Sequence, residues 1–464
     1  MIPFDNSYVH LPAQMFTRQS AAQVPDPEMI SANGPLAALL GIDPDWLTTD
    51  AACDIFAGNA VAAGSQPLAA AYAGHQFGNW NPGLGDGRAL LLGEVIGTDG
   101  IRRDIQLKGS GPTPYSRNGD GRAWLGPVLR EYLVSEAMHA MCVPTTRALA
   151  AVTTGEAVYR EEPLPGAIIT RVAQSHIRVG TFQLMAARGD IPALTALFDH
   201  VVARHYPDAE NPAALLTAVT HAQAHLIAKW MSIGFIHGVM NTDNVSIAGE
   251  TIDYGPCAFM DAYHADSVFS AIDRGGRYAY ANQPRIAVWN LAQFATSLIP
   301  LMPDQDAAIE EFTGIINGFP EVYEAAWIAG FGAKLGLVKP SEEDRALIED
   351  LLALMQADGA DFTATFAGLA GPNAQDQFVD RDAFSAWANR WHLREFDPAI
   401  MAAANPQVIP RNHQVEAVIA AGRTGDFAPF HAMLAAVTDP YAAHETYSQP
   451  PALSERVTRT FCGT

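Results

Sequence analysis

Positive charge is scarce in this sequence. Its 464 residues include 28 lysines and arginines against 50 aspartates and glutamates, and only four of the basic residues are lysines. The formal net charge is −22. A protein this acidic is poorly suited to bind nucleic acid or anionic lipid, because both need a basic surface that neutralises phosphate groups. We therefore expect neither of these partners.

Cysteine and long apolar runs are also scarce. The cysteines at 53, 142, 257 and 462 are far apart and form no C-x-x-C pair, which indicates neither a zinc site nor a disulfide scaffold. The most apolar run, at 288–302, is interrupted by polar residues and proline, and it is shorter than the roughly 20 residues that span a bilayer. The first residues lack the basic-then-apolar order of a signal peptide. We expect a soluble, cytoplasmic protein.

The apolar content is that of a globular protein. Apolar residues make up 49% of the chain and charged residues 17%, which is enough for a sizeable core. Before about residue 186 the pattern favours strands, for example at 89–96 and in the alternating stretch 103–108, together with one helix at 127–141.

Later in the chain the pattern becomes helical. A long amphipathic helix is predicted at 212–234, followed by short strands at 245–247 and near residue 252, and then by Ala-rich helices. The sequence therefore predicts an α+β fold of two lobes, a β-rich lobe at 1–186 and a helical lobe at 187–464, with a cleft between them.

The basic residues are concentrated in one region. Between Arg88 and Arg188 there are 12 basic and 9 acidic residues, whereas the remainder of the chain has 16 basic and 41 acidic ones. A pocket for a small, highly charged anion such as a nucleoside triphosphate would explain this distribution. Chance clustering with surface ion pairs explains it equally well.

A glycine-rich stretch, NPGLGDGR at 81–88, leads into the first of these strands. Its glycines, among them Gly85 and Gly87, would let backbone N–H groups approach a phosphate. The spacing matches neither the Walker A loop nor the dinucleotide-binding motif of Rossmann folds. A plain β-turn is the commoner explanation of such a stretch.

A lysine ends the second strand. Lys108 could point into the cleft and contact a phosphate, although a lysine at a strand end more often extends into water. Glu131 lies on the next helix, and kinases use a strand lysine paired with a helix glutamate to aim the lysine at phosphates. Glu136 is the competing partner, but it lies roughly 140° around the helix from Glu131, so the two cannot both face Lys108.

Two polar motifs follow the long helix, HGVMNTDN at 237–244 and DYG at 253–255. Asn244 and Asp253 would offer one neutral and one anionic oxygen ligand to Mg²⁺, and Asp243 would accept a proton from an attacking hydroxyl. Each motif alone is typical of a turn or a helix cap. Their order behind a glycine loop and a strand lysine favours a nucleotide site.

Two arginines flank a strand end in the basic region. Arg171 and Arg178 could each bind phosphate oxygens with two N–H groups. Pairing with nearby carboxylates is the alternative, and the sequence does not decide between the two.

Longer blocks of this sequence closely resemble the SelO (YdiU, selenoprotein O-like) family of protein adenylyltransferases, and the resemblance covers nearly the whole chain. The blocks are AYAGHQFGNW at 71–80, GDGR at 85–88, QLKGSGPTPYSR at 106–117, HGVMNTDN at 237–244, DYG at 253–255 and NPQVIPRN at 405–412.

This resemblance implies a protein-kinase-like fold that binds ATP in a flipped orientation. It implies transfer of AMP to Ser, Thr or Tyr hydroxyls of proteins, with the enzyme itself among the candidates, release of pyrophosphate, and Mg²⁺ or Mn²⁺ as cofactor. Asp243 would be the proton acceptor, and Asn244 and Asp253 would be the metal ligands. The implied nucleotide contacts, with Glu131 supporting Lys108, are Gly85, Gly87, Arg88, Lys108, Asp120, Gly121, Arg171, Arg178 and Asp253.

The resemblance also implies a disulfide. Bacterial members of the family are associated with a bond between a cysteine near the C-terminus and one just after the Asp-x-Gly motif, the positions that Cys462 and Cys257 occupy. Such a bond would tether the C-terminal tail over the cleft. Two reduced thiols, the usual cytosolic state, are the alternative.

Two other functions use the same residues. Kinase-type transfer of the γ-phosphoryl group would also need Lys108, Asn244 and Asp253. An inert nucleotide-binding scaffold would need no proton acceptor, and the presence of Asp243 beside these residues argues against it.

Overall fold

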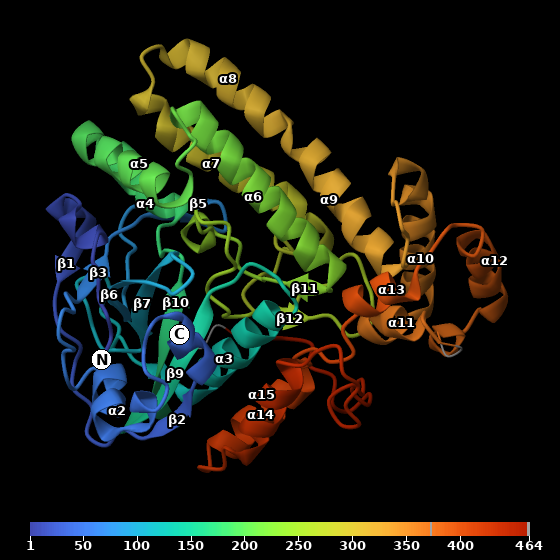
Figure 1. The fold of residues 1–464 in the computed structure, drawn as a ribbon, viewed down its shortest axis with the longest axis horizontal. Helices are drawn as coiled ribbons and strands as arrows, with labels where there is room; N and C mark the ends of the chain where they lie inside the picture. The colour runs from blue at the N-terminus through green and yellow to red at the C-terminus, as the bar shows by residue number, and fades with distance from the viewer. Residues whose placement is uncertain (372–373, 462–464) are drawn as a thin grey trace.

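The computed structural model describes residues 1–371 and 374–461. The fold mixes strands and helices, and the two are largely separated along the chain (Figure 1). All strands of the main sheet end before residue 174, whereas helices dominate from residue 179 onward. The expected mixture of a β-rich first part and a helical second part is confirmed.

One antiparallel sheet organises the first part of the chain. Its eight strands are β1 (Phe16–Arg18), β2 (Met29–Ala32), β3 (Leu68–Ala70), β6 (Ala89–Ile96), β7 (Arg102–Lys108), β8 (Ala123–Trp124), β9 (Arg147–Tyr159) and β10 (Pro163–Ala173). They are hydrogen-bonded in the order β1–β3–β6–β7–β10–β9–β2, and β8 pairs with β10 outside this order. Two short pairs lie apart from the sheet, β4 (Gly74–Gln76) with β5 (Asn79–Asn81) and β11 (Phe235–Ile236) with β12 (Ala258–Phe259).

Helices cover the sheet and form the rest of the molecule. Those of the first part are α1 (Gly34–Leu39), α2 (Asp50–Ala57) and α3 (Leu125–Ala140), and α3 packs against β9 and β10. The later helices are α4 (Val179–Ala187), α5 (Ile191–His205), α6 (Pro212–Ser232), α7 (Gln283–Leu298), α8 (Gln305–Asn317), α9 (Phe319–Lys334), α10 (Arg345–Asp358), α11 (Phe362–Gly368), α12 (Arg381–Trp391), α13 (Pro398–Ala404), α14 (Asn412–Gly422) and α15 (Ala428–Val437). Helix α6 contacts α7, α8 and α9, and these helices extend away from the sheet in Figure 1.

The register of the sheet brings three polar side chains together. In the pairing of β7 with β10, Gln106 lies directly opposite Arg171, and Lys108 follows two residues later. Because side chains alternate along a strand and directly opposed residues share a face, all three point to one side of the sheet. The predicted strands at 89–96 and 103–108 and the predicted helices at 127–141 and 212–234 are confirmed to within two residues.

The prediction of short strands at 245–247 and near residue 252 is wrong. Ser246 and Thr251 each form only an isolated bridge, and turns and bends lie between them. Val245 and Ile247, which suggested a strand, are buried in the core. A short buried apolar run has the same sequence signature whether or not it pairs as a strand.

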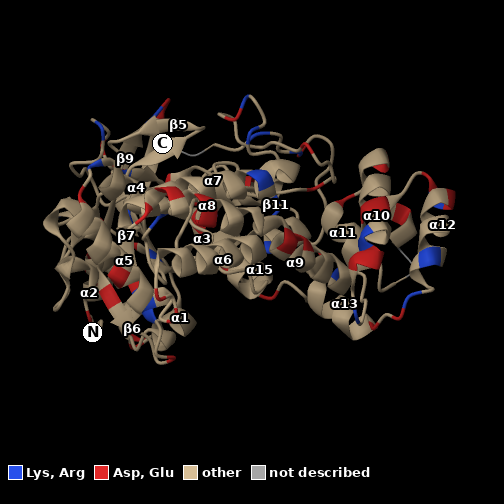
Figure 2. Cartoon of the chain, turned by 90° about the horizontal axis from the view of Figure 1, so that it is seen from above, with Lys and Arg blue, Asp and Glu red and all other residues tan. Residues whose placement is uncertain are grey.

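Negative charge lies mainly on the helical part of the chain. In Figure 2, acidic residues recur along α8, α9 and α10, where basic residues are few. None of the helices in the described ranges is long and apolar enough to cross a bilayer.

A buried lysine lies near the end of α9. Lys334 is 3% exposed, and its ammonium lies 4.6 Å from the ring centroid of Phe366 and 5.6 Å from that of Phe362. No carboxylate among the described residues forms an ion pair with it. Burial lowers the pKa of Lys334 to about 7. Cation–π contacts offset only part of the desolvation of an ammonium group, so the charged form destabilises the fold.

We predict that Lys334→Met raises the free energy of unfolding by about 1–3 kcal/mol at pH 6.5. The folded-state pKa lies below that of the unfolded chain, so the folded wild type gains stability as the pH rises from about 7 towards 10. The advantage of the variant should therefore shrink over this range. Urea unfolding at pH 6.5 and pH 9 measures both effects. Exposed Lys339→Met is the control, and an equal change in both variants would contradict the prediction.

Candidate active site

A single carboxylate lies at the centre of the site. Asp253 has a left-handed backbone conformation, with φ of 64°, which is uncommon for a residue other than glycine. Its carboxylate binds three cationic groups: Lys108 Nζ at 3.1 Å, Arg171 Nη1 at 2.6 Å and Arg178 Nη1 at 2.5 Å. These contacts join the end of β7, the strand β10 and the start of α4 to the segment that follows β11.

Glu131 on α3 completes the cluster. Its two oxygens bind Lys108 Nζ at 2.6 Å and Arg171 Nη1 at 3.2 Å. Glu136, the competing partner, is bound instead by Arg147 through hydrogen bonds of 2.8 and 2.6 Å. The two glutamates therefore face different neighbours, as their angular separation on the helix requires.

The cluster is close to electrically balanced. Asp86, which is buried, adds a third carboxylate 3.9 Å from Arg178 Nη2, so the three cations meet three carboxylates. Burial would raise the pKa of Asp253, but Arg171, Arg178 and Lys108 together hold it well below its usual range. Asp253 is therefore ionised at neutral pH, and an anionic ligand must compete with it to reach the cations.

Asp243 lies beside this cluster, in the 3₁₀-helix η4 (Thr242–Asn244). Its side chain is buried; Oδ2 accepts a hydrogen bond from Gln76 Nε2 at 3.1 Å, and Oδ1 accepts none from the described residues. Burial raises the pKa of Asp243 to about 6, against the opposing effects of Gln76 and Arg178. A carboxyl group with a pKa near neutrality and an unbonded oxygen is suited to accept a proton.

The β4–β5 hairpin holds the loop that carries Asp243. His75 N donates to Thr242 Oγ1 at 2.7 Å, and Phe77 N donates to Asn241 Oδ1 at 3.0 Å. The sequence did not identify Gln76 as a site residue, although it lies in the block at 71–80. Its position over the loop depends on tertiary packing, which the local pattern does not contain.

Asn244 and Asp253 have the chemistry of metal ligands. Asn244 Nδ2 donates to Val239 O at 2.8 Å, which leaves the amide oxygen available to another partner. One neutral and one anionic oxygen fit Mg²⁺ or Mn²⁺. In the part of the chain that the structure describes, no group of three or more His, Cys, Asp or Glu side chains could hold a metal ion. A cation at Asn244 and Asp253 therefore needs further oxygen ligands, such as phosphate and water.

The glycine-rich loop folds against the segment that follows β7. A side chain at Gly85 would lie 2.5 Å from the Tyr115 ring, and one at Gly87 would lie 2.8 Å from Tyr115 O. Both positions therefore require glycine for steric reasons, whatever the loop binds. The Arg88 side chain is half-buried and makes no hydrogen bond or ion pair within the described residues.

Asp120 and Gly121 lie outside the cluster. The exposed Asp120 carboxylate pairs with Arg160 at 2.7 Å rather than with a member of the cluster. Gly121 has a φ of 65° and packs against Gly111, so it serves the turn between β7 and β8. Within the described residues, the side chains of Arg88 and Asn244 likewise make no hydrogen bond or ion pair with Asp253, whereas Lys108, Glu131, Arg171 and Arg178 are joined to it or to its partners.

The cysteine pairing expected from the resemblance stays a prediction, because Cys462 lies outside the described residues. Cys257 is buried, four residues after Asp253. The described end of the chain lies close by, since Thr460 Oγ1 donates to Pro256 O at 2.6 Å and Arg130 donates to Phe461 O at 2.9 Å.

Comparisons with known proteins agree with the resemblance. A family model described as protein adenylyltransferase SelO matches residues 1–438. The chain is similar to the protein nucleotidyltransferase YdiU of Ruegeria pomeroyi, with 59% identity over 470 residues, and to that of Roseobacter denitrificans, with 61% identity over 467 residues. Each match covers 100% of this chain and 99% of the relative. The YdiU of Rhizobium etli is 54% identical over 486 residues, which cover 99% of this chain and 97% of that protein.

We predict that Gly85→Ala lowers the free energy of unfolding by about 1–3 kcal/mol. The new Cβ would clash with the Tyr115 ring, and the φ of 129° is one that alanine rarely adopts. Gly83→Ala in the same loop is the matched control, because nothing lies within 4 Å of its Cβ position. Thermal and urea unfolding compare the two variants, and equal stability would contradict the prediction.

Proposed function

Because the chain belongs to the SelO family of protein adenylyltransferases, we propose that it transfers AMP from ATP to Ser, Thr or Tyr hydroxyls of proteins and releases pyrophosphate. The observation that carries the proposal is the cluster in which three cationic side chains bind Asp253. Three cations gathered around one carboxylate offer a site to a polyanion that can compete with that carboxylate. A nucleoside triphosphate is such a polyanion.

Binding of ATP would exchange the partners in this cluster. As phosphate oxygens replace the carboxylate at Lys108, Arg171 and Arg178, Asp253 becomes available to a metal ion, with Asn244 as the second ligand. A bound Mg²⁺ or Mn²⁺ would neutralise negative charge on the phosphates and on the departing pyrophosphate. This exchange couples the two ligands, so each should bind more tightly in the presence of the other.

Asp243 would act as the proton acceptor. The acceptor oxygen forms a bond to the α-phosphorus while the bond from the α-phosphorus to the oxygen bridging to the β-phosphate breaks. The hydroxyl proton passes to Asp243, and pyrophosphate leaves with the bonding electron pair. The pKa of about 6 and the unbonded Oδ1 of Asp243 support this role.

The remaining proposed contacts surround the triphosphate. Glu131 would keep Lys108 in place after Asp253 leaves, because it binds the same ammonium group at 2.6 Å. The Arg88 side chain makes no hydrogen bond or ion pair within the described residues, which supports a role in ligand binding. The further residues proposed to contact the nucleotide are Gly85, Gly87, Asp120 and Gly121.

We extend the proposal to the architecture, a kinase-like fold with lobes at 1–186 and 187–464. The pairing of a strand lysine with a helix glutamate supports it. The origin of the clustered residues supports it too, since Lys108 and Arg171 come from the sheet and Asp253 from the helical part of the chain.

We predict that protein-bound label appears from ATP labelled at the α-phosphate and not from ATP labelled at the γ-phosphate. The enzyme alone and the enzyme with added acceptor protein are incubated with Mg²⁺, and Asp253→Ala is the inactive control. The same residues could serve γ-phosphoryl transfer. Retention of γ-label alone would therefore replace AMP transfer with kinase activity.

We predict that Asp253→Asn binds metal-free ATP about ten-fold more tightly than the wild type does, because the competing carboxylate charge is gone. Addition of Mg²⁺ should strengthen ATP binding in the wild type and have little effect in the variant. Calorimetry with and without a chelator measures both quantities, with exposed Asp208→Asn as the control. Weaker metal-free binding by Asp253→Asn would argue against the partner exchange.

A further inference from the structure

The guanidinium group of Arg171 is bound along two of its edges. Its side chain is 2% exposed, and Nη1 faces the carboxylates of Asp253 and Glu131. On the other edge, Nε and Nη2 both donate to Gln106 Oε1, at 3.3 and 2.8 Å. The proposed partner exchange removes Asp253 from the first edge and leaves the second edge unchanged.

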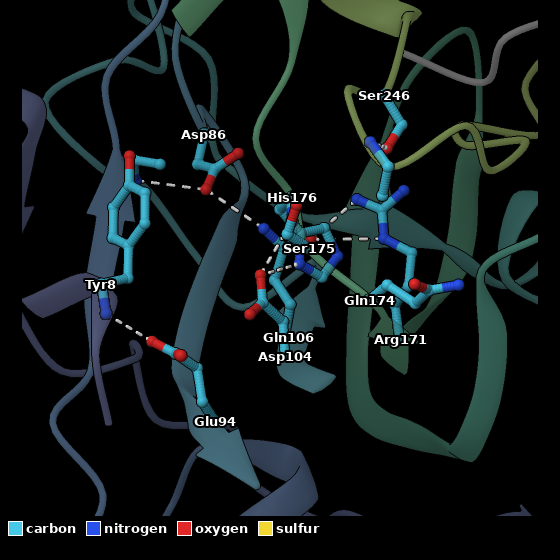
Figure 3. Close-up of polar contacts among 12 residues, drawn as sticks. Tyr8, Asp86, Glu94, Asp104, Gln106, Arg171, Gln174, Ser175, His176 and Ser246 are labelled. Carbon is cyan, nitrogen blue, oxygen red and sulfur yellow. Dashed lines mark hydrogen bonds and ion pairs between the residues drawn. The ribbon is translucent and has the colours of Figure 1, made fainter. Parts of the chain in front are cut away.

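The amide of Gln106 can point in only one direction. Gln106 is fully buried, and its Nε2 donates to Asp86 Oδ2 at 3.1 Å (Figure 3). A guanidinium group only donates hydrogen bonds, so the oxygen of the amide must face Arg171 and its nitrogen must face Asp86. Asp86 is itself held by Ala70 N, which donates to the same Oδ2 at 3.1 Å.

We propose that Gln106 and Asp86 are positioning residues for the triphosphate, a role that rests on the proposed function. They hold the Nε–Nη2 edge of Arg171, so that the opposite edge stays directed at the phosphates after Asp253 has left. Without them, the guanidinium group could follow Asp253 or rotate about its long side chain. A fixed arginine binds an anion with a smaller loss of side-chain entropy.

The position of Asp86 in the chain strengthens the inference. Asp86 lies between Gly85 and Gly87, so the hydrogen bonds from Asp86 to Gln106 and from Gln106 to Arg171 link the glycine-rich loop to the arginine. In a second buried polar network Asp104 binds His176 and Arg204, and within the described residues no hydrogen bond or ion pair joins these three side chains to Asp86 or Asp253. The network through Gln106 thus connects the glycine-rich loop to Arg171, and the 3.9 Å approach of Asp86 to Arg178 Nη2 connects the same loop to the second arginine.

The test measures displacement of a fluorescent ATP analogue by ATP and by adenosine, which has no phosphate. Gln106→Met, which keeps the side-chain length, should weaken ATP binding by about ten-fold and leave adenosine binding unchanged. Asp86→Ala should also weaken ATP binding and leave adenosine binding unchanged. In an Arg171→Met background, Gln106→Met should have little further effect. Gln414→Met, a buried glutamine far along the chain, is the matched control and should bind both ligands normally.

Two results would overturn the positioning role: an equal loss of ATP and adenosine binding, or a full effect of Gln106→Met in the Arg171→Met background. If Gln106→Met does not fold, as judged by circular dichroism, Asp86→Ala decides by the same criteria. The α-label assay tests the proposed function separately. Variants that lose ATP affinity as expected would support the positioning role even if no AMP reached a protein.

Discussion

The contact between Asp253 and three cationic side chains is the interaction on which the site depends. Arg171 and Arg178 are buried, and Asp253 and Lys108 are partly buried, so each of these charges needs a partner to compensate for its lost hydration. Asp253 therefore draws Lys108, Arg171 and Arg178 to one point and joins the sheet to the helical part of the chain. In the protein without ligand, the proposed phosphate-binding side chains are therefore already close together, and the Asp253 carboxylate binds all three of them.

Because these groups already bind one another, the site discriminates between a metal ion, a nucleotide and the complex of the two. An isolated metal ion meets a carboxylate that is held by cations, and an isolated triphosphate meets cations that are held by a carboxylate. A metal–nucleotide complex satisfies both sets of groups at once, so the site favours the complex over either component. In the proposed mechanism Gln106 and Asp86 keep Arg171 directed at the ligand while phosphate oxygens replace Asp253.

Much of the fold and part of the site could be predicted from local patterns. The strand that ends at Lys108 and the helix that carries Glu131 follow from periodicities of two and of 3.6 residues.

Contacts between distant segments of the chain could not be predicted from these local patterns. Helical spacing separated Glu131 from Glu136, but the choice between them required the position of Arg147. The convergence of two arginines on Asp253 and the place of Gln106 opposite Arg171 depend on sheet register. Likewise, the pattern at 245–247 predicts a strand, but in the structure only Ser246 pairs, in an isolated bridge with Arg178.

The most direct measurement is a crystal structure with Mg²⁺ and an ATP analogue that resists cleavage between its α- and β-phosphates. The account predicts phosphate oxygens at Lys108, Arg171 and Arg178, with Asp253 turned towards the metal beside Asn244. A complex in which the triphosphate binds elsewhere, while Asp253 keeps all three cationic partners, would contradict it.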